Sequence, residues 1–214
     1  EETESNFSWN AAVTNDYVFR GVSQSDGGPA LQLGADYAFG DSGVYVGVWG
    51  SNIDYGSDGP DIELDAYIGW SKDLSDDWNL DLSVVRHSYF GERDGYGSID
   101  YNEFIGKLAW SEKVTGVFAY SNDYSNTNES SFYYGLEGAF PVAEKTSFNT
   151  TLGYTVIDGE EGYITNFYDA SVGISHEFGP VTADLSYHDT FGSDSSDLGD
   201  IGDGRVVLLL SIGG

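Results

Sequence analysis

The sequence contains no cysteine and no methionine among its 214 residues, and only 8 of them are lysine or arginine. The absence of cysteine excludes disulfides, thiolate metal sites, cysteine nucleophiles and iron–sulfur clusters. The 36 aspartates and glutamates give a net charge of −28, which excludes a nucleic-acid binder that works by neutralising phosphates. No apolar run reaches the roughly 18 to 20 residues that a membrane helix needs. A search for long apolar runs does not detect membrane-spanning strands, because their signal is an alternation of apolar and polar residues.

Aromatic residues are abundant although the chain is acidic. It contains 16 Tyr, 12 Phe and 5 Trp at a mean hydropathy of −0.30. Disordered acidic chains are poor in aromatic and β-branched residues, so we expect this chain to fold, as one domain over residues 1–214. Its first four residues lack a basic and apolar signal region, which suits a cytosolic protein or an exported one whose signal peptide has been removed.

Apolar and polar residues alternate along most of the chain, as they do in strands with two different faces. In the segments 31–39 and 62–70, for example, every second residue is apolar or aromatic. About twelve such segments, at roughly eighteen residues per strand and connection, approach the spacing of bacterial outer-membrane barrels. The pattern predicts an all-β fold without helices.

The predicted connections alternate in length. Longer polar stretches are expected near 20–29, 51–60, 88–100, 121–130, 158–165 and 189–203. Between them lie tight turns near 40–43, 72–77, 111–113, 141–145 and 177–180. Short turns at one rim, long loops at the other, and an even number of strands are typical of a transmembrane antiparallel up-and-down β-barrel. This layout predicts that both termini and the short turns face the periplasm, and that the long loops are extracellular.

Aromatic residues cluster at both predicted rims. Beside the short turns we expect an outward-facing girdle of Phe39, Trp70, Trp78, Trp110, Phe140 and Phe148. Beside the long loops we expect a second girdle of Tyr17, Phe19, Tyr55, Phe90, Tyr101, Tyr120, Tyr154, Tyr168 and Tyr187. Amphipathic rings prefer the lipid–water interface. A soluble β-barrel or sandwich also predicts alternation, but it explains neither the aromatic rims nor the alternating loop lengths.

Several stretches resemble the TorF-like porins of Gram-negative outer membranes. The strongest is Asp16-Tyr17-Val18-Phe19-Arg20-Gly21-Val22-Ser23-Gln24-Ser25, and further matches are Gly47–Asn52, Glu63–Asp65 and Asp203–Val207. The resemblance implies a pore-forming barrel of the bacterial outer membrane, exported with a cleaved signal peptide that is absent from this chain.

If the apolar face meets lipid, the other face lines the lumen. The alternation assigns to this face the acidic residues Asp36, Asp61, Glu63, Asp65, Asp81, Glu103, Glu137, Asp169 and Asp184. The basic residues assigned to the same face are Arg20, Lys107 and Arg205. Excess carboxylates favour cations in water-filled pores. Arg20 is expected either to pair with Asp36 or Asp61 or to act as a constriction residue. The alternative to an open lumen is one that is plugged by arginine–carboxylate networks.

The last long loop carries carboxylates at every third position, namely Asp194, Asp197, Asp200 and Asp203. A flexible loop rich in oxygen ligands can bind Ca²⁺ weakly, but this spacing is not that of an EF-hand, and a solvated acidic loop is the simpler interpretation. We expect no other cofactor. His87, His176 and His188 are scattered over distant strands, which predicts neither a metal site nor a catalytic centre.

The sequence thus predicts an outer-membrane porin for passive diffusion of small hydrophilic solutes, with a weak preference for cations and no enzymatic activity. The alternative is a structural or interaction barrel with a largely closed lumen, whose acidic extracellular loops bind ions, lipopolysaccharide or partner proteins. The expected partners are outer-membrane lipid, lipopolysaccharide, and small solutes or ions, but no nucleic acid. Assembly into a homo-oligomer stays open.

Overall fold

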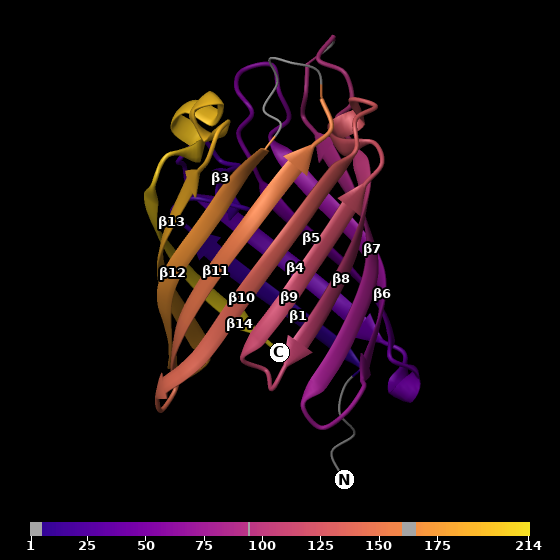
Figure 1. The fold of residues 1–214 in the computed structure, drawn as a ribbon, viewed down its shortest axis with the longest axis vertical. Coiled ribbons are helices and arrows are strands. Elements are labelled where there is room, and N and C mark those ends of the chain that lie inside the picture. The colour runs from indigo at the N-terminus through magenta and orange to yellow at the C-terminus, as the bar shows by residue number, and fades with distance from the viewer. Residues whose placement is uncertain (1–5, 94, 160–165) are drawn as a thin grey trace.

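The computed structural model describes residues 6–93, 95–159 and 166–214, and it shows a closed antiparallel barrel of twelve strands (Figure 1). The barrel strands are β1 (Phe7–Thr14), β4 (Ala30–Ala38), β5 (Val44–Asn52), β6 (Ile62–Asp73), β7 (Trp78–Phe90), β8 (Tyr101–Trp110), β9 (Val114–Ser121), β10 (Ser131–Ala143), β11 (Thr146–Ile157), β12 (Asn166–Phe178), β13 (Val181–Phe191) and β14 (Arg205–Gly213). Pairing of β1 with β14 closes the barrel, with Asn10 opposite Gly213. The predicted fold class and strand number are confirmed.

The connections alternate between short and long, as predicted. The short turns lie at the lower end in Figure 1, where β1 also begins and β14 ends, and the long loops lie at the upper end. Three 3-10 helices are described: η1 (Gly40–Ser42), η2 (Tyr124–Asn126) and η3 (Ser195–Gly202). Within the described ranges, no helix has the length and apolarity needed to cross a membrane. Most of the expected loop at 158–165 lies outside the described residues.

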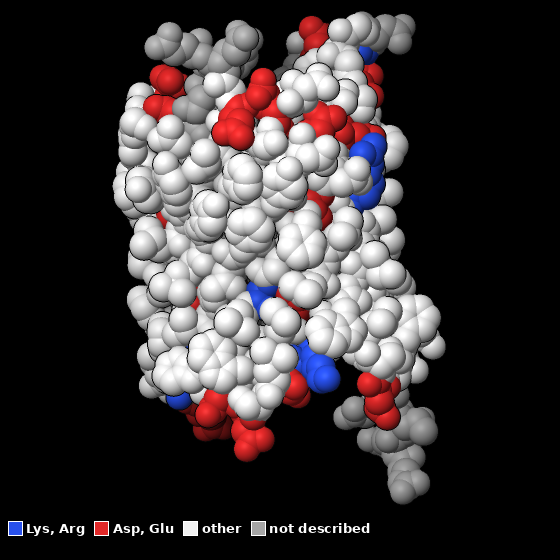
Figure 2. All heavy atoms as spheres, turned by 45° about the vertical axis from the view of Figure 1, so that its right-hand side comes forward, with Lys and Arg blue, Asp and Glu red and all other residues white. Residues whose placement is uncertain are grey.

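Apolar side chains face outwards and acidic ones face inwards. Leu33, Val172 and Leu208 are 54%, 49% and 45% exposed, whereas Glu103 and Asp169 are 1% and 3% exposed. The alternation causes this, because neighbouring residues of a strand point to opposite faces of the sheet. Acidic residues gather at the two ends of the face in Figure 2, and the band between them is largely uncharged. An apolar band bounded by polar ends suits a surface in contact with lipid.

The aromatic residues beside the short turns point outwards. Phe39, Trp78, Trp110, Phe140 and Phe148 are exposed, and Trp70 is half-buried. Pairing brings several of them together across strands, because Trp78 lies opposite Trp110 and Phe140 lies opposite Phe148. Aromatic pairs of this kind stabilise neighbouring strands.

The second expected girdle is only partly correct. Phe90, Tyr168 and Tyr187 are exposed on the outer face. In contrast, Tyr17, Phe19, Tyr55 and Tyr101 belong to the interior: Tyr101 is 4% exposed, Tyr17 packs edge-on against Trp49, and Tyr55 packs against a buried cluster that includes Tyr101. Tyr101 lies two residues before Glu103 on β8, so the alternation places it on the inward face and not in the outer girdle. The other three residues lie in loops that fold over or into the barrel.

Candidate functional site

A short hairpin folds from the first long loop into the barrel. Strands β2 (Val18–Phe19) and β3 (Val22–Ser23) pair only with each other, separately from the barrel sheet, and we call residues 18–23 the inner hairpin. The two turn residues, Arg20 and Gly21, have φ values of 48° and 80°, as a two-residue type I′ turn requires. A Cβ atom on Gly21 would lie 2.7 Å from both Asp169 Cβ and Thr190 Cγ2. The tip therefore reaches the inner wall at β12 and β13.

Arg20 anchors the tip of the inner hairpin to β8. Its Nη1 and Nη2 atoms donate to Glu103 Oε1 and Oε2 at 2.8 and 2.9 Å, and this bidentate geometry is the strongest form of an arginine–carboxylate pair. The side chains are only 13% and 1% exposed. The guanidinium carbon also lies 4.3 Å from the centre of the Tyr133 ring, a distance suited to a cation–π contact.

This arrangement corrects two predictions from the sequence. Arg20 lies on the inner hairpin rather than on the wall, and it pairs with Glu103 rather than with Asp36 or Asp61. Asp61 precedes β6 at the long-loop rim, where it is exposed and its backbone N–H donates to Phe90 O. Counting in steps of two along β6 assigns Asp61 to the inward face. However, β6 begins at Ile62, so Asp61 lies at the rim and not in the lumen.

The base of the inner hairpin is held by Asp16. Its Oδ1 accepts from Ser23 Oγ at 2.6 Å and Ser25 Oγ at 3.1 Å, and its Oδ2 accepts from Arg205 Nη1 at 2.7 Å. Arg205 also donates to the carbonyl oxygens of Asp200 and Asp203. Arg205 is thus a rim residue that ties the hairpin to the last loop.

Two cavities meet at the inner hairpin. The larger, of about 590 Å³, is lined by residues from the long loops, such as Tyr96, Leu198 and Ile201. The smaller, of about 280 Å³, is lined by wall residues that include Lys107, Glu137 and Asp169. Phe19 and Arg20 line both cavities. The inner hairpin is therefore a partition between an outer vestibule and an inner chamber.

The remaining carboxylates predicted for the lumen point inwards from the wall. Tyr67 donates to Asp36 Oδ1 at 2.6 Å, and Tyr45 donates to both oxygens of Asp81 at 2.9 Å. Pairing sets Lys107 opposite Asp81. Two further carboxylates have weaker or longer contacts: Tyr133 donates to Asp169 at 3.5 Å and Asn149 donates to Asp184 at 3.2 Å. Lys107 and Glu137 are the exposed charges of the inner chamber.

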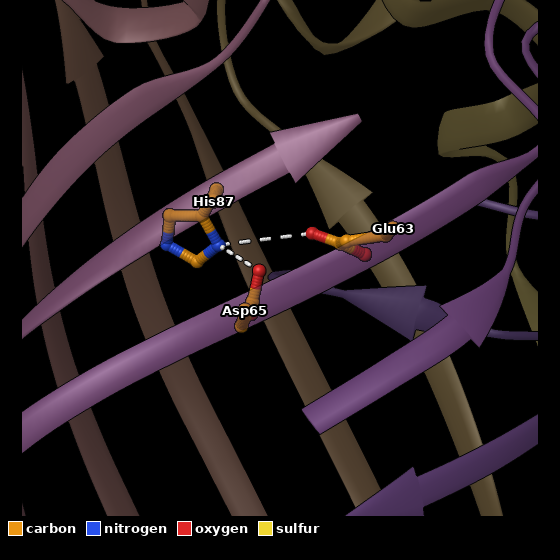
Figure 3. Close-up of side chains that lie close together, drawn as sticks. All are labelled: Glu63, Asp65 and His87. Carbon is orange, nitrogen blue, oxygen red and sulfur yellow. Dashed lines mark hydrogen bonds and ion pairs between the residues drawn. The ribbon is translucent and has the colours of Figure 1, made fainter. Parts of the chain in front are cut away.

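Glu63, Asp65 and His87 converge on the wall between β6 and β7 (Figure 3). His87 Nδ1 lies 2.9 Å from Asp65 Oδ1 and 3.7 Å from Glu63 Oε1. Their ligand atoms all lie within 4.8 Å of one another, and of the residues described these three form the only such group of three or more. Alternation alone does not reveal this group, because only the register sets His87 opposite Asp65.

The other two histidines make local contacts on other strands. His176 Nδ1 lies 2.7 Å from Thr146 Oγ1 near the short-turn rim. His188 Nε2 lies 3.0 Å from Ser186 Oγ, but no described carboxylate hydrogen-bonds to His188, and Asp184 on the same strand is held by Asn149. A Ser–His pair needs a third group to orient the imidazole.

The last loop forms η3 and does not gather its carboxylates. Asp194 precedes η3, and its Oδ2 accepts from the Asn166 backbone N–H at 3.0 Å. Within the described residues, no three of Asp194, Asp197, Asp200 and Asp203 bring ligand atoms close enough to share one ion. The loop-bound Ca²⁺ stays a prediction.

Comparison with known proteins supports the barrel fold. Among solved structures, the COG4313 outer membrane channel from Pseudomonas putida F1 matches with a TM-score of 0.56 at 13% identity, over 100% of this chain and 96% of that chain. The NanC porin matches with a TM-score of 0.55 at 11% identity, over 97% of each chain. The KdgM porin matches with a TM-score of 0.52 at 5% identity, over 97% of this chain and 96% of that chain. At these identities the likeness shows the fold alone.

Sequence comparison gives the family. No curated protein matches the chain. The sequence model of one family, described as a bacterial protein of unknown function (Gcw_chp), matches residues 2–208. That match spans nearly the whole barrel, from the residues before β1 into β14. The chain therefore belongs to the Gcw_chp family of bacterial proteins, and it has the fold of the outer-membrane porins.

Proposed function

We propose that the protein is a channel of the bacterial outer membrane through which small hydrophilic solutes diffuse passively. The observation that carries the proposal is the pair of cavities inside a barrel whose outer face is apolar, with charged side chains lining the inner chamber. Polar groups inside a transmembrane barrel are stable where water reaches them. The porin-like fold supports the same role.

The lumen should favour cations weakly. Inward-facing carboxylates outnumber Arg20, Lys107 and Arg205, and Arg20 and Arg205 are each already paired with a carboxylate. Carboxylates with low-dielectric walls around them raise the local cation concentration. Glu137 contributes most directly, because it is exposed to the inner chamber.

The inner hairpin supports a second candidate function. Because it crosses the lumen and its Arg20–Glu103 pair is almost fully buried, it favours a largely closed barrel that acts as a scaffold, with the long loops binding ions, lipopolysaccharide or partner proteins. The resemblance to TorF-like porins, export by a cleaved signal peptide, the absence of catalysis and assembly into a homo-oligomer remain predictions under either function.

Planar-bilayer recording in a salt gradient separates the two functions. The channel predicts ohmic current steps with a reversal potential of cation sign, and the scaffold predicts silence. Glu137→Lys should reduce the cation-to-anion permeability ratio by roughly threefold or more, because charged clefts hold potentials of a few kT. Glu92→Lys, a change at an exposed position of the β7–β8 loop that lines neither cavity, should leave the ratio close to that of the wild type. Equal ratios for both variants would contradict the assignment of Glu137 to the ion path.

A further inference from the structure

We propose that Glu63, Asp65 and His87 form a binding site for one divalent transition-metal ion of the Zn²⁺ class. The site lies in the barrel wall and goes beyond channel function, since metal binding there does not require the lumen to conduct. The three side chains come from neighbouring strands and point towards one another in Figure 3. Two carboxylate oxygens and one imidazole nitrogen are thus presented to a single point.

The distances between the ligand atoms suit a small ion. Metal–ligand distances of about 2.0–2.1 Å in a tetrahedral site correspond to about 3.3 Å between ligand atoms. His87 Nδ1 lies 2.9 Å from Asp65 Oδ1 and 3.7 Å from Glu63 Oε1, on either side of that separation. A change of about 0.4 Å in each of the two distances would give the separation of a tetrahedral site.

The cluster has more carboxylates than arginine or lysine partners. Glu63, Asp65 and Glu103 contribute three carboxylates, and Arg20 is the only arginine or lysine of the described chain that pairs with any of them. Two negative charges therefore remain when His87 is neutral, and a divalent ion would balance them. Buried charges are stable when they are paired or coordinate a metal.

An unsatisfied carboxylate oxygen of Glu63 points to a ligand independently. Glu63 is 4% exposed and His87 is 5% exposed. Glu63 Oε1 accepts from the Tyr89 hydroxyl at 3.0 Å, but Glu63 Oε2, the second oxygen that could bind the ion, has no hydrogen-bond partner among the described residues. Buried polar atoms of this kind are rare in native proteins, and a bound ion is one of their physical explanations.

The surroundings of His87 also fit a metal ligand. When Nδ1 binds an ion, Nε2 must carry the proton; it has no hydrogen-bond partner among the described residues, and the neighbouring Glu103 Oε2 lies 3.9 Å away. Tyr101 stacks on the imidazole ring with 4.5 Å between the ring centres and fixes its plane. A carboxylate is the usual partner of the far nitrogen of a metal-binding histidine, and Glu103 would take that role after an approach of about 1 Å.

The donor set determines the class of ion. Imidazole combined with carboxylate oxygens suits Zn²⁺ and related first-row ions, whereas Ca²⁺ takes six to eight oxygen ligands. Asp65 has the most exposed side chain of the three at 13%, so the ion would enter past Asp65. This site is separate from the predicted calcium loop at 194–203.

Metal binding is measured on the tag-free, folded barrel in detergent after chelation with EDTA. Titration calorimetry with Zn²⁺ alone should show one bound equivalent that millimolar Mg²⁺ and Ca²⁺ do not displace. His87→Gln and Asp65→Asn should each weaken Zn²⁺ binding at least about tenfold, because even outer-shell changes at such sites cost that much. His188→Gln removes a histidine on β13 outside the cluster and should bind as the wild type does, as should Asp197→Asn in the last loop.

A second measurement on the unmodified chain avoids dependence on variants that fail to fold. The chain has only three histidines, so ¹⁵N-imidazole spectra can follow each one, and Zn²⁺ should shift the Nδ1 resonance of His87 alone. Failure of the wild type to bind Zn²⁺, binding that His87→Gln leaves unchanged, or a shift confined to His176 or His188 would each overturn the proposal.

Discussion

Replacing Gly21 with valine should raise the single-channel conductance several-fold. Gly21 lies at the tip of the inner hairpin, and a Cβ atom there would approach Asp169 Cβ and Thr190 Cγ2 to 2.7 Å. Its φ of +80° is also strained for a β-branched residue. Both effects push the tip away from β12 and β13, which removes the partition between the vestibule and the inner chamber. Single-channel recording in planar bilayers measures the change.

Gly27→Val is the matched control for this experiment. Gly27 belongs to the same loop and has a φ of +71°, but a Cβ atom there would meet nothing within 4 Å. The control therefore carries the backbone strain without the collision in the lumen, and its conductance should equal that of the wild type. If Gly21→Val and Gly27→Val conduct equally, the inner hairpin does not limit the current.

Replacing Arg20 with alanine should lower the free energy of unfolding by about 3 to 5 kcal/mol, the usual cost of removing one partner of a buried ion pair. The loss is large because Glu103 is 1% exposed and would keep a charge without its partner. The contact with the Tyr133 ring is lost as well. Urea unfolding from lipid vesicles, followed by tryptophan fluorescence, gives the free energy.

Two variants test the cause of that loss. Arg93→Ala removes a pair with Asp58 whose side chains are 72% and 69% exposed, and exposed pairs contribute only about 0 to 1 kcal/mol. The double variant Arg20→Met with Glu103→Leu removes both charges and should recover much of the stability, because similar apolar replacements are often neutral. A loss for Arg20→Ala no larger than that for Arg93→Ala would show that water already solvates Glu103.

The barrel itself could be predicted from the sequence, because lipid imposes a simple rule on every strand. Alternation identifies the strands, and parity then assigns each side chain to one face, as it does for Leu33 and Asp36. Loop length needs no tertiary information, so the two rims could also be distinguished. The pattern is strong because every backbone group in a membrane must be paired within the barrel.

The inner hairpin could not be predicted from alternation. Its strands are two residues each, too short to show a period, and parity assigns a residue to a face without giving its partner across the lumen. Glu103 lies 83 positions from Arg20. One local signal was available: glycine after Arg20 suits a tight turn with positive φ, and Asp16 with Ser23 and Ser25 could have closed its base.

The Glu63–Asp65–His87 cluster required the strand register as well as parity. Glu63 and Asp65 share a face by alternation alone, and both were predicted to line the lumen. His87 joins them only because the β6–β7 pairing sets it opposite Asp65. Counting from the turn at 74–77 could have paired these strands, since short hairpin connections restrict the register.

Accessibility of single cysteines tests most directly the claim that an acidic, hydrated lumen is surrounded by a lipid-facing apolar wall. The chain has no native cysteine, so Thr151→Cys and Leu152→Cys each give one thiol, on opposite faces of β11. Thr151 lines the inner chamber, and Leu152 is 52% exposed on the outer face. In proteoliposomes, Thr151→Cys should react with charged, membrane-impermeant thiosulfonates, faster with the cationic than with the anionic reagent, and Leu152→Cys should stay protected. Rapid labelling of Leu152→Cys with protection of Thr151→Cys would contradict the account.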